Sequence, residues 1–480
     1  MLLFCQRGAP FLLIGLAAFF LRTFDLARRP MHADEANQAV KLGLLLETGR
    51  YEFDARDHHG PTLYYFAAPI AWLRGQTSLV ALDETTVRLV PAIAGTISVL
   101  LLGALAFPLG RGPALIAAAL MAVSPPAVYY SRYFVHETLL VTFTLAALVS
   151  AQQWWRHARP LWAIAAGGCG GLMLATKELA PLFVTAALLG VIVVRAKPVS
   201  SSITRGATLA LFAALIIAFL FYSSFGANFG GLRAAIEALG IGVTRATGVS
   251  GHEKPWWYYL RLFEWERRGG IVWQQLGFTA LAVAGVGVAV LSGKKMLRWA
   301  AVYVAVLAIV MSLVPYKTPW HAIHFVPALA LLAAGAWAAI PNGVVAAFVV
   351  LAAVAMQGFQ TYRAAFVYPA DERNPYAYVH SSPDVLKFRA LVVAALAHTP
   401  QLPIRIISEE YWPLPWYLRG LPRIGYWPAP PDDCDGALVI ASAKQAEAVR
   451  SRLHGNYRET FLGLRPGFLC VVFVKNTPSP

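Results

Sequence analysis

An adjacent pair of carboxylates, Asp34 and Glu35, follows the first long apolar stretch of the sequence, within MHADEANQAV (residues 31–40). The chain is 58% hydrophobic and only 14% charged, so two neighbouring acids need a reason. A carboxylate that faces a cavity can remove the proton from a hydroxyl group within hydrogen-bond reach. Burial beside a second carboxylate would raise the pKa of one of the two and make it a better base. The structural alternative is that the acids only stabilise the N-terminus of a helix.

Four further motifs combine polar and ionisable side chains: YEFDARDHHGP (51–61), SRYFVHE (131–137), TKE (176–178) and PYKTPWHAIH (315–324). Lysine and arginine can hold a phosphate group, and arginine does so in a bidentate way. Histidines and acids at the ends of apolar segments are costly there and are typical of a substrate pocket. The candidate binding residues are His58, His59, Arg132, His136, Glu137, Lys177, Glu178, Lys317 and His321.

Each motif also has a structural alternative. Residues 58–61 suit a turn before a helix, with proline in the first turn. The carboxylate of Glu137 could pair with Arg132, and the two charges of TKE could form a simple loop pair. The basic residues of PYKTPWHAIH could lie at a membrane interface with their polar ends reaching toward water.

Long apolar runs recur through the first three quarters of the 480 residues. A helix needs about 20 apolar residues to cross a bilayer core of roughly 30 Å, so the sequence predicts a polytopic α-helical membrane protein. The predicted spans are 9–27, 87–108, 113–130, 134–151, 160–175, 179–195, 206–225, 272–292, 298–315, 322–340 and 342–359, about eleven in all.

The distribution of basic residues predicts the orientation in the membrane. With a cytoplasmic N-terminus, the short inner loops would hold nine basic residues and the short outer loops three, which fits the positive-inside rule. The inner set is Arg111, Arg156, Arg159, Arg195, Lys197, Arg205, Lys294, Lys295 and Arg298, and the outer set is Arg132, Lys177 and Lys317. We therefore expect an inner (plasma) membrane protein with all the polar motifs on the extracytoplasmic side, where they can meet in one cavity.

Three larger segments would then lie outside the membrane: residues 28–86, 226–271 and 360–480. The second contains KPWWYYLRLFEWERR, whose tryptophan and tyrosine density is typical of a helix in the membrane interface. We expect residues 1–359 to form the membrane domain and residues 360–480 to form a separate extracytoplasmic domain.

The tail alternates predicted helices and strands, which indicates a small α/β domain. DVLKFRALVVAALAHT and AKQAEAVRSRL have helical patterns, and IRIISEE, ALVIAS and FLCVVFVK have strand patterns. An oxidising compartment could join Cys434 and Cys470, which both fall in this domain. The net charge of +15 comes without a basic run interleaved with aromatics, so nucleic acid is not an expected partner.

These motifs have a family resemblance. A first span followed by an outer loop with Asp-Glu resembles the GT-C superfamily of polyprenyl-phosphate-sugar-dependent glycosyltransferases, in particular its protein mannosyltransferase and lipid A aminoarabinose transferase branches. More narrowly, MHADEANQAVKLGLLLETGRYEFDARDHHGPTLYY, SRYFVHE, YKTPW, NPYAYVHSSPD and EEYWPLPWYLRG resemble the flippase activity-associated membrane protein family, which is linked to archaeal N-glycosylation.

The resemblance implies a GT-C-type bundle that moves a sugar from a polyprenyl-phosphate donor to a protein, lipid or glycan acceptor, with inversion at the sugar carbon. It places the catalytic base at Asp34, with Glu35 orienting that base or the acceptor. Arg132, Lys177 and Lys317 would hold the donor phosphate. The sugar pocket would be shaped by His58, His59, His136 and Glu137.

Some members of the superfamily use a divalent metal held by first-loop and later-loop acids. The later acids available here are Glu137 and Glu178, with His32, His58 and His136 as further possible ligands, so a metal stays possible.

Two readings without catalysis remain. A lipid-linked sugar transporter or flippase-associated protein would have charged residues on both sides of the membrane midplane. A scaffold of a glycan assembly complex would depend on its tail.

Overall fold

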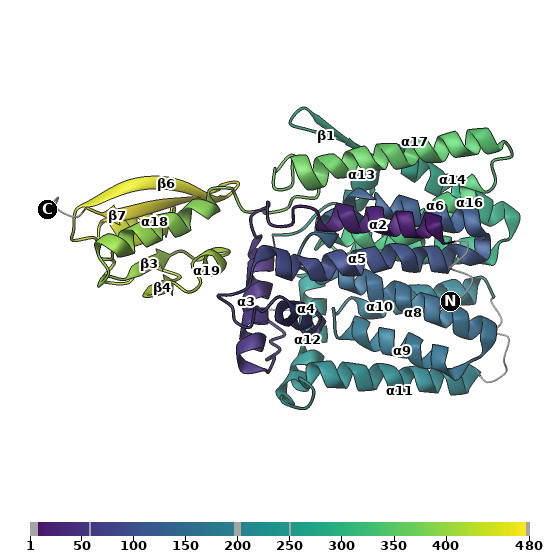
Figure 1. Cartoon of the computed structure of the whole chain (residues 1–480), viewed down its shortest axis with the longest axis horizontal. Helices are drawn as coiled ribbons and strands as arrows, with labels where there is room; N and C mark the ends of the chain where they lie inside the picture. Colours follow the sequence, from purple (N-terminus) through teal and green to yellow (C-terminus); the bar gives the residue numbers. More distant parts are fainter. Residues whose placement is uncertain (1–7, 57–58, 196–202, 249–250, 477–480) are drawn as a thin grey trace.

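The computed structural model describes residues 8–56, 59–195, 203–248 and 251–476. Its N-terminal three quarters form a helical bundle, and its C-terminal quarter forms an α/β domain at one end of that bundle (Figure 1). The fold expected from the sequence, a helical membrane bundle followed by an α/β domain, is confirmed.

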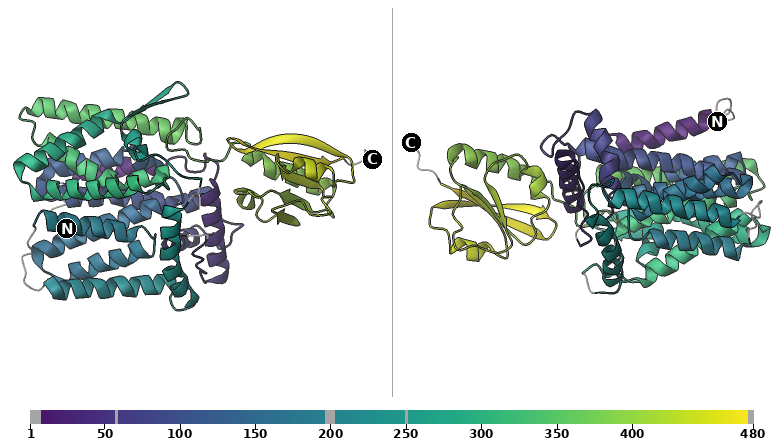
Figure 2. Two further views of the ribbon diagram at one scale, coloured as in Figure 1. Left: turned by 180° about the vertical axis from the view of Figure 1, so that it is seen from behind. Right: turned by 90° about the horizontal axis from the view of Figure 1, so that it is seen from below.

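The helices of the bundle lie side by side, with most of their axes roughly parallel or antiparallel to one another (Figures 1 and 2). They are α2 (Ala9–Thr23), α5 (Glu84–Ala106), α6 (Arg111–Ala122), α7 (Pro125–Ser131), α8 (Glu137–His157), α9 (Pro160–Leu174), α10 (Ala180–Val193), α11 (Ile203–Tyr222), α14 (Leu276–Ser292), α15 (Lys295–Leu313), α16 (Val326–Trp337) and α17 (Gly343–Tyr362). Each predicted span falls on one of these helices, with α6 and α7 sharing one.

Within the described ranges, five helices are long and apolar enough to cross a membrane on their own, or six if the bent pair α6–α7 is one span. Others, such as α2, α9, α10 and α14, are apolar but shorter than 18 residues. The number of spans therefore stays a prediction.

Two helices lie across the end of the bundle that faces the C-terminal domain: α3 (Ala33–Thr48) and α12 (Gly230–Thr247) (Figure 1). The start of α3 is set by a capping box. The His32 side chain accepts the backbone N–H of Asp34, and the Glu35 carboxylate accepts the backbone N–H of His32. The short helix α4 (Thr62–Leu73) follows at the same end.

The aromatic and basic stretch KPWWYYLRLFEWERR is not the single interface helix that its composition suggested. It forms the six-residue helix α13 (Tyr258–Phe263) and then strand β1 (Trp265–Arg268), which pairs with β2 (Ile271–Gln274) in an antiparallel hairpin. The physical reason is Gly269–Gly270, whose φ angles of 51° and 81° supply the left-handed backbone that a two-residue hairpin turn requires.

The C-terminal domain has a five-stranded sheet with the order β4-β3-β5-β7-β6. Strands β4 and β5 flank β3 and are parallel to it, and β7 is antiparallel to both of its neighbours, β5 and β6. The elements are α18 (Val385–His398), β3 (Ile404–Ile407), α19 (Leu414–Tyr417), β4 (Ile424–Trp427), β5 (Leu438–Ser442), α20 (Ala446–Arg450), β6 (Tyr457–Arg465) and β7 (Phe468–Lys475). The predicted helices and strands of the tail correspond to α18, β3, β5, α20 and β7, whereas β4, α19 and β6 were not foreseen.

The proposed disulfide between Cys434 and Cys470 is not formed, because both thiols are free. Alternation along β7 turns Cys470 and Val472 toward the core shared with α18. Cys434 belongs to the second core on the other face of the sheet, with Val471 and Phe473. The sheet itself therefore separates the two sulfurs.

We expect tryptic digestion under non-reducing conditions to give no peptide pair linked through Cys434 and Cys470. We also expect a reducing agent to leave the thermal unfolding midpoint of the purified protein unchanged, since there is no covalent cross-link to remove. Mass spectrometry of the digest checks the first statement. A linked pair that disappears on reduction would contradict the prediction.

Candidate active site

A cavity of about 550 Å³ opens at the end of the bundle where α3 and α12 lie. This volume is in the range of small-molecule sites. Its walls come from seven separate segments of the sequence, and they bring together most of the polar motifs singled out above. The polar and aromatic lining residues are Asp34, Asn37, Gln38, His59, His136, Glu137, Lys177, Glu178, Tyr259, Tyr316, Trp320 and His321.

One side of the cavity is apolar. Leu179 and Leu182 at the start of α10, Leu239 of α12, and Met311 with Val314 at the end of α15 form it. The same cavity thus offers a charged region beside an aliphatic wall. Such a combination suits a ligand with an anionic head and a hydrocarbon tail.

One ion pair and one histidine–carboxylate hydrogen bond occupy the charged region. The Lys177 ammonium pairs with the Glu137 carboxylate, and both side chains are buried. His59 Nδ1 lies 2.9 Å from a carboxylate oxygen of Glu178. These partners differ from the structural alternatives raised for the sequence, since Glu137 does not pair with Arg132, nor does Lys177 pair with its chain neighbour.

The pKa of Glu178 results from opposing effects. Burial raises it, but the adjacent His59 and Lys177 together lower it below its ordinary value. The Glu178 carboxylate is therefore ionised at neutral pH, and it bonds His59 within the cavity wall.

Gly60 makes the contact between the two loops possible. Its backbone N–H donates to the carbonyl of Thr176 at 3.1 Å, and the N–H of Thr62 donates to that of Ala175. A Cβ atom at Gly60 would lie 2.2 Å from the Ala175 oxygen, so only glycine allows this approach. The approach places His59 against Glu178 and lets His136 bond the Gly60 carbonyl at 2.9 Å.

Asp34 occupies the second position of α3 and faces the cavity with 48% of its side chain exposed. His32 lies beside it, with Nδ1 3.8 Å from the nearer carboxylate oxygen. That nitrogen accepts the Asp34 backbone N–H, and Nε2 lies 3.0 Å from the carbonyl of Tyr378, so the ring proton is on Nε2. His32 consequently does not donate to Asp34. Within the described ranges, the other two cavity carboxylates, Glu137 and Glu178, each have a basic partner within hydrogen-bond distance. The basic group nearest to the Asp34 carboxylate is His32, at 3.8 Å.

Glu35 lies behind the cavity wall, is fully buried and does not line the cavity. Its two oxygens accept Arg88 Nε and one Arg88 terminal nitrogen at 2.8 Å, together with an Arg29 nitrogen at 3.0 Å. They also accept the backbone N–H groups of His32 and Phe134 at 3.1 and 3.0 Å. Burial raises the pKa of Glu35, but the two arginines and the hydrogen bonds outweigh it and lower the pKa to about 2. The adjacent acids thus have different places, and the expected rise in pKa does not occur at Glu35.

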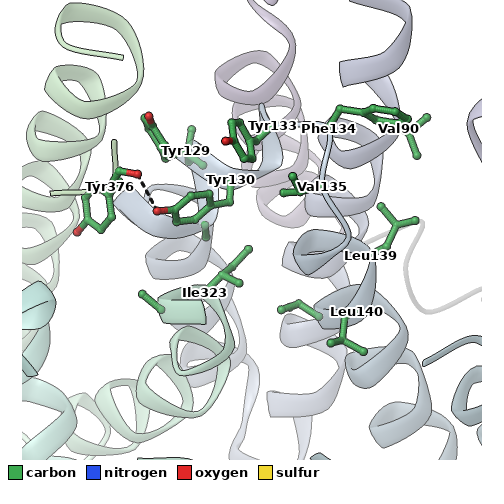
Figure 3. Packing of buried hydrophobic residues seen from close by; sticks show 14 of the residues in the cluster. Val90, Tyr129, Tyr130, Tyr133, Phe134, Val135, Leu139, Leu140, Ile323 and Tyr376 are labelled. Atoms are coloured by element: carbon green, nitrogen blue, oxygen red, sulfur yellow. Dashed lines mark hydrogen bonds between the residues drawn. The ribbon is translucent and has the colours of Figure 1, made fainter. Parts of the chain in front are cut away.

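The segment after α7 is held by tyrosines (Figure 3). The Tyr130 hydroxyl donates to the Tyr376 carbonyl at 2.9 Å, and the Tyr129 hydroxyl donates to the Pro369 carbonyl at 2.6 Å. The Arg29 guanidinium lies 4.6 Å from the centre of the Tyr133 ring. This packing fixes the segment that presents the Phe134 N–H to Glu35 and places His136 and Glu137 at the start of α8.

Two of the predicted phosphate ligands lie elsewhere. The Arg132 guanidinium bonds the carbonyls of Leu21, Phe24 and Asp25, and it does not line the cavity. Lys317 is buried, and its ammonium bonds the carbonyls of Val314 and Lys254. Backbone carbonyls thus satisfy both cations. Of the three predicted cations, Lys177 is the one in the cavity, and His58 lies outside the described residues.

Two contributors were not foreseen. Arg88 lies within the span predicted at 87–108, and an ionisable residue at such a position signals a buried partner. Tyr259 bonds His321 through its hydroxyl at 3.2 Å, inside the aromatic stretch that was read as an interface helix. The first could have been found from the sequence, whereas the second depends on the tertiary contact.

The donor set does not fit a divalent metal well. Among the described residues, no group of three or more His, Cys, Asp or Glu side chains is arranged to hold an ion. Glu137 and Glu178, the later acids that could have joined Asp34, each have a basic partner. A metal bound there would have to displace Lys177 or His59.

The family described as dolichyl-phosphate-mannose-protein mannosyltransferase matches residues 58–222. The structure of ArnT from Cupriavidus metallidurans bound to undecaprenyl phosphate superposes with a TM-score of 0.72 at 14% identity, covering 98% of this chain and 99% of that one. The chain has the GT-C fold.

Two other GT-C structures are similar over less of their own length. The oligosaccharyltransferase AglB from Archaeoglobus fulgidus gives a TM-score of 0.58 at 12% identity, over 94% of this chain and 72% of that one. The arabinofuranosyltransferase AftD from Mycobacteria gives 0.51 at 15% identity, over 98% and 40%. No curated protein matches the sequence. These likenesses support the same fold, and the narrower flippase-associated resemblance stays a prediction.

Replacing Glu35 by glutamine should destabilise the protein by about 3–5 kcal/mol, because it leaves Arg29 and Arg88 as buried charges without a carboxylate. Asp34→Asn, at the neighbouring half-exposed position, is the matched control and should change stability by about 0.5 kcal/mol or less. Unfolding of both variants in detergent micelles measures the difference. Equal effects of the two substitutions would contradict the separation of their places.

The same stability difference should depend on pH in a defined direction. A carboxylate whose pKa is lower in the folded than in the unfolded state stabilises the fold above the unfolded value. For Glu35 this contribution is present at neutral pH and is lost as the pH falls from about 4.5 toward about 2. A difference between wild type and Glu35→Gln that vanishes already at pH 6 would contradict this.

Proposed function

We propose that the protein is a membrane glycosyltransferase that moves a sugar from a polyprenyl-phosphate donor to an acceptor hydroxyl or amide, with Asp34 as the general base. The observation that carries this proposal is the single cavity in which the accessible Asp34 carboxylate shares the space with Lys177 and an aliphatic wall. The solved structures of the same fold bear on the donor class, since ArnT was crystallised bound to undecaprenyl phosphate and AglB was solved in complex with a dolichol-phosphate.

The charged and apolar parts of the lining set the direction in which the donor would lie in the cavity. Its hydrocarbon chain would lie along Leu182, Met311 and Val314, and its phosphate would lie toward the Lys177 ammonium. Lys177 already neutralises Glu137, so a bound phosphate would form the third member of a charge network. His59, His136 and His321 would then surround the sugar.

The reaction needs few groups. Asp34 removes the proton from the acceptor as the acceptor atom attacks the anomeric carbon of the sugar. The bond between that carbon and the phosphate oxygen breaks, and polyprenyl phosphate leaves with the electron pair. Attack from the face opposite the leaving phosphate inverts the sugar carbon. Lys177 stabilises the charge that develops on the phosphate oxygen.

The arrangement of charges favours an enzyme over a transporter. Alternating access calls for polar residues on both sides of the membrane midplane. Here the ionisable lining residues gather at the end of the bundle next to α3 and the C-terminal domain. The distribution of lysine and arginine between loops supports an extracytoplasmic position for this end, in an inner (plasma) membrane.

Asp34→Asn should lower the turnover number about 10²–10⁴-fold, since the amide cannot accept the proton. The measurement is release of polyprenyl phosphate by the purified protein in nanodiscs, offered a panel of polyprenyl-phosphate sugars and acceptors. Glu237→Gln, which removes a half-exposed acid from α12, is the control and should leave turnover unchanged. Full turnover by the Asp34 variant would overturn the assignment of the base, and movement of the donor across the bilayer without release would support the transporter.

Removing the cavity cation should weaken donor binding. The double variant Lys177→Met/Glu137→Gln avoids leaving a buried unpaired acid, and it should raise the KM for the donor about 10–100-fold through loss of a charged hydrogen bond. Lys317→Met is the comparison, because its ammonium bonds carbonyls outside the cavity. A raised KM in the Lys317 variant with an unchanged KM in the double variant would place the phosphate elsewhere.

A further inference from the structure

A second pocket of about 360 Å³ lies between α13, strand β1 and residues 375–378. It is distinct from the candidate active-site cavity, and the two spaces share a wall. Tyr258 lines the second pocket, whereas the next residue, Tyr259, lines the first. Likewise the ring of Tyr378 in the second pocket meets edge-on the ring of Trp320 in the first, with centres 5.9 Å apart.

The wall between the two spaces is fixed by backbone contacts. The Lys254 N–H donates to the Pro315 carbonyl at 3.1 Å, and Glu253 forms a β-bridge with Tyr316. The Tyr378 carbonyl faces His32, the residue that caps α3. A ligand in the second pocket would therefore lie next to the same structure that carries Asp34.

The second pocket is basic. It contains three cations, Lys254, Arg261 and Arg268, and one acid, Glu266, which leaves a charge of +2 (3 − 1). Glu266 is 9% exposed and pairs with Arg268 at 2.9 Å and Arg261 at 3.3 Å. The Lys254 ammonium lies 5.7 Å from the centre of the Tyr378 ring and has no carboxylate partner among the described residues. An anionic group would complete this pocket.

The pocket also has the features of a saccharide site. The rings of Tyr258 and Tyr378 offer aromatic faces against which the C–H groups of a sugar can pack, and the arginine–glutamate cluster offers paired donors and acceptors for hydroxyl groups. Trp256, Trp257 and Trp265 on the flanking segments are 61%, 44% and 53% exposed, as is typical of the membrane–water interface.

We propose that this second pocket binds a part of the acceptor that is remote from its reacting atom, and that this part is a saccharide carrying a phosphate or carboxylate group. The description of the ligand as an acceptor rests on the proposed transferase function. Binding of the anionic saccharide itself does not require turnover. Lys254 contacts the anionic group, Tyr258 and Tyr378 pack on the ring, and the pocket is a substrate-binding site beside the catalytic one.

Saturation-transfer NMR on the full-length protein in detergent micelles tests this with three probes: glucose 6-phosphate, glucuronate and glucose. The two anionic sugars should receive saturation, and glucose should receive several-fold less. Lys254→Gln should weaken binding of the anionic sugars about tenfold, since it removes one charged contact. Arg233→Gln removes a charge from a side chain of α12 that is 88% exposed, and it should leave binding unchanged.

Two outcomes would overturn the proposal. One is that neither anionic sugar binds better than glucose, or that Lys254→Gln binds as the wild type does. The other is that undecaprenyl phosphate or the Lys177→Met/Glu137→Gln change abolishes the signal, which would place the probe in the first cavity. Binding that depends on Lys254 in a protein without transferase activity would keep the pocket and remove the proposed function, so the two failures are distinguishable.

Discussion

The buried carboxylate of Glu35 is the interaction on which the arrangement of this end of the bundle depends. A charge without access to water is tolerated only with close partners, and Glu35 has two arginines and two backbone N–H groups. These groups come from the loop before α3, from α5 and from the segment before α8. The Glu35 side chain therefore fixes the relative positions of three distant parts of the chain. These contacts also fix the orientation of α3.

The same rule organises the cavity. Glu137 pairs with the Lys177 ammonium and Glu178 bonds the His59 ring, so each of these acids has a close partner in the cavity wall. Asp34 is the exception, since it lies at the exposed second position of α3 and His32 directs its ring proton elsewhere. The two adjacent acids thus have different roles. Glu35 stabilises the fold, and Asp34 is left accessible for chemistry.

The C-terminal domain is joined to this arrangement through Met31. The Met31 N–H donates to the Tyr417 hydroxyl, and its carbonyl accepts the Ser381 hydroxyl, each at 2.7 Å. Trp416 bonds Glu84 at the start of α5. The domain therefore contacts both the chain that leads into α3 and the helix that supplies Arg88. A bound molecule that moved the domain would act on the residues next to Asp34.

The helical membrane bundle, the α/β tail and the motifs that meet at one end could be predicted from the sequence, because apolar period and run length are local properties that burial selects directly. The sequence did not show that Glu35 is buried between two arginines, nor did it separate Lys177 from Arg132 and Lys317. Those differences depend on which partner each charge meets, and the partners are up to about a hundred residues away, as Phe134 is from Glu35. The tertiary structure also decided the β1–β2 hairpin and the separation of Cys434 from Cys470. In both cases strand pairing, which joins residues across a turn or a sheet, outweighed what composition alone suggested.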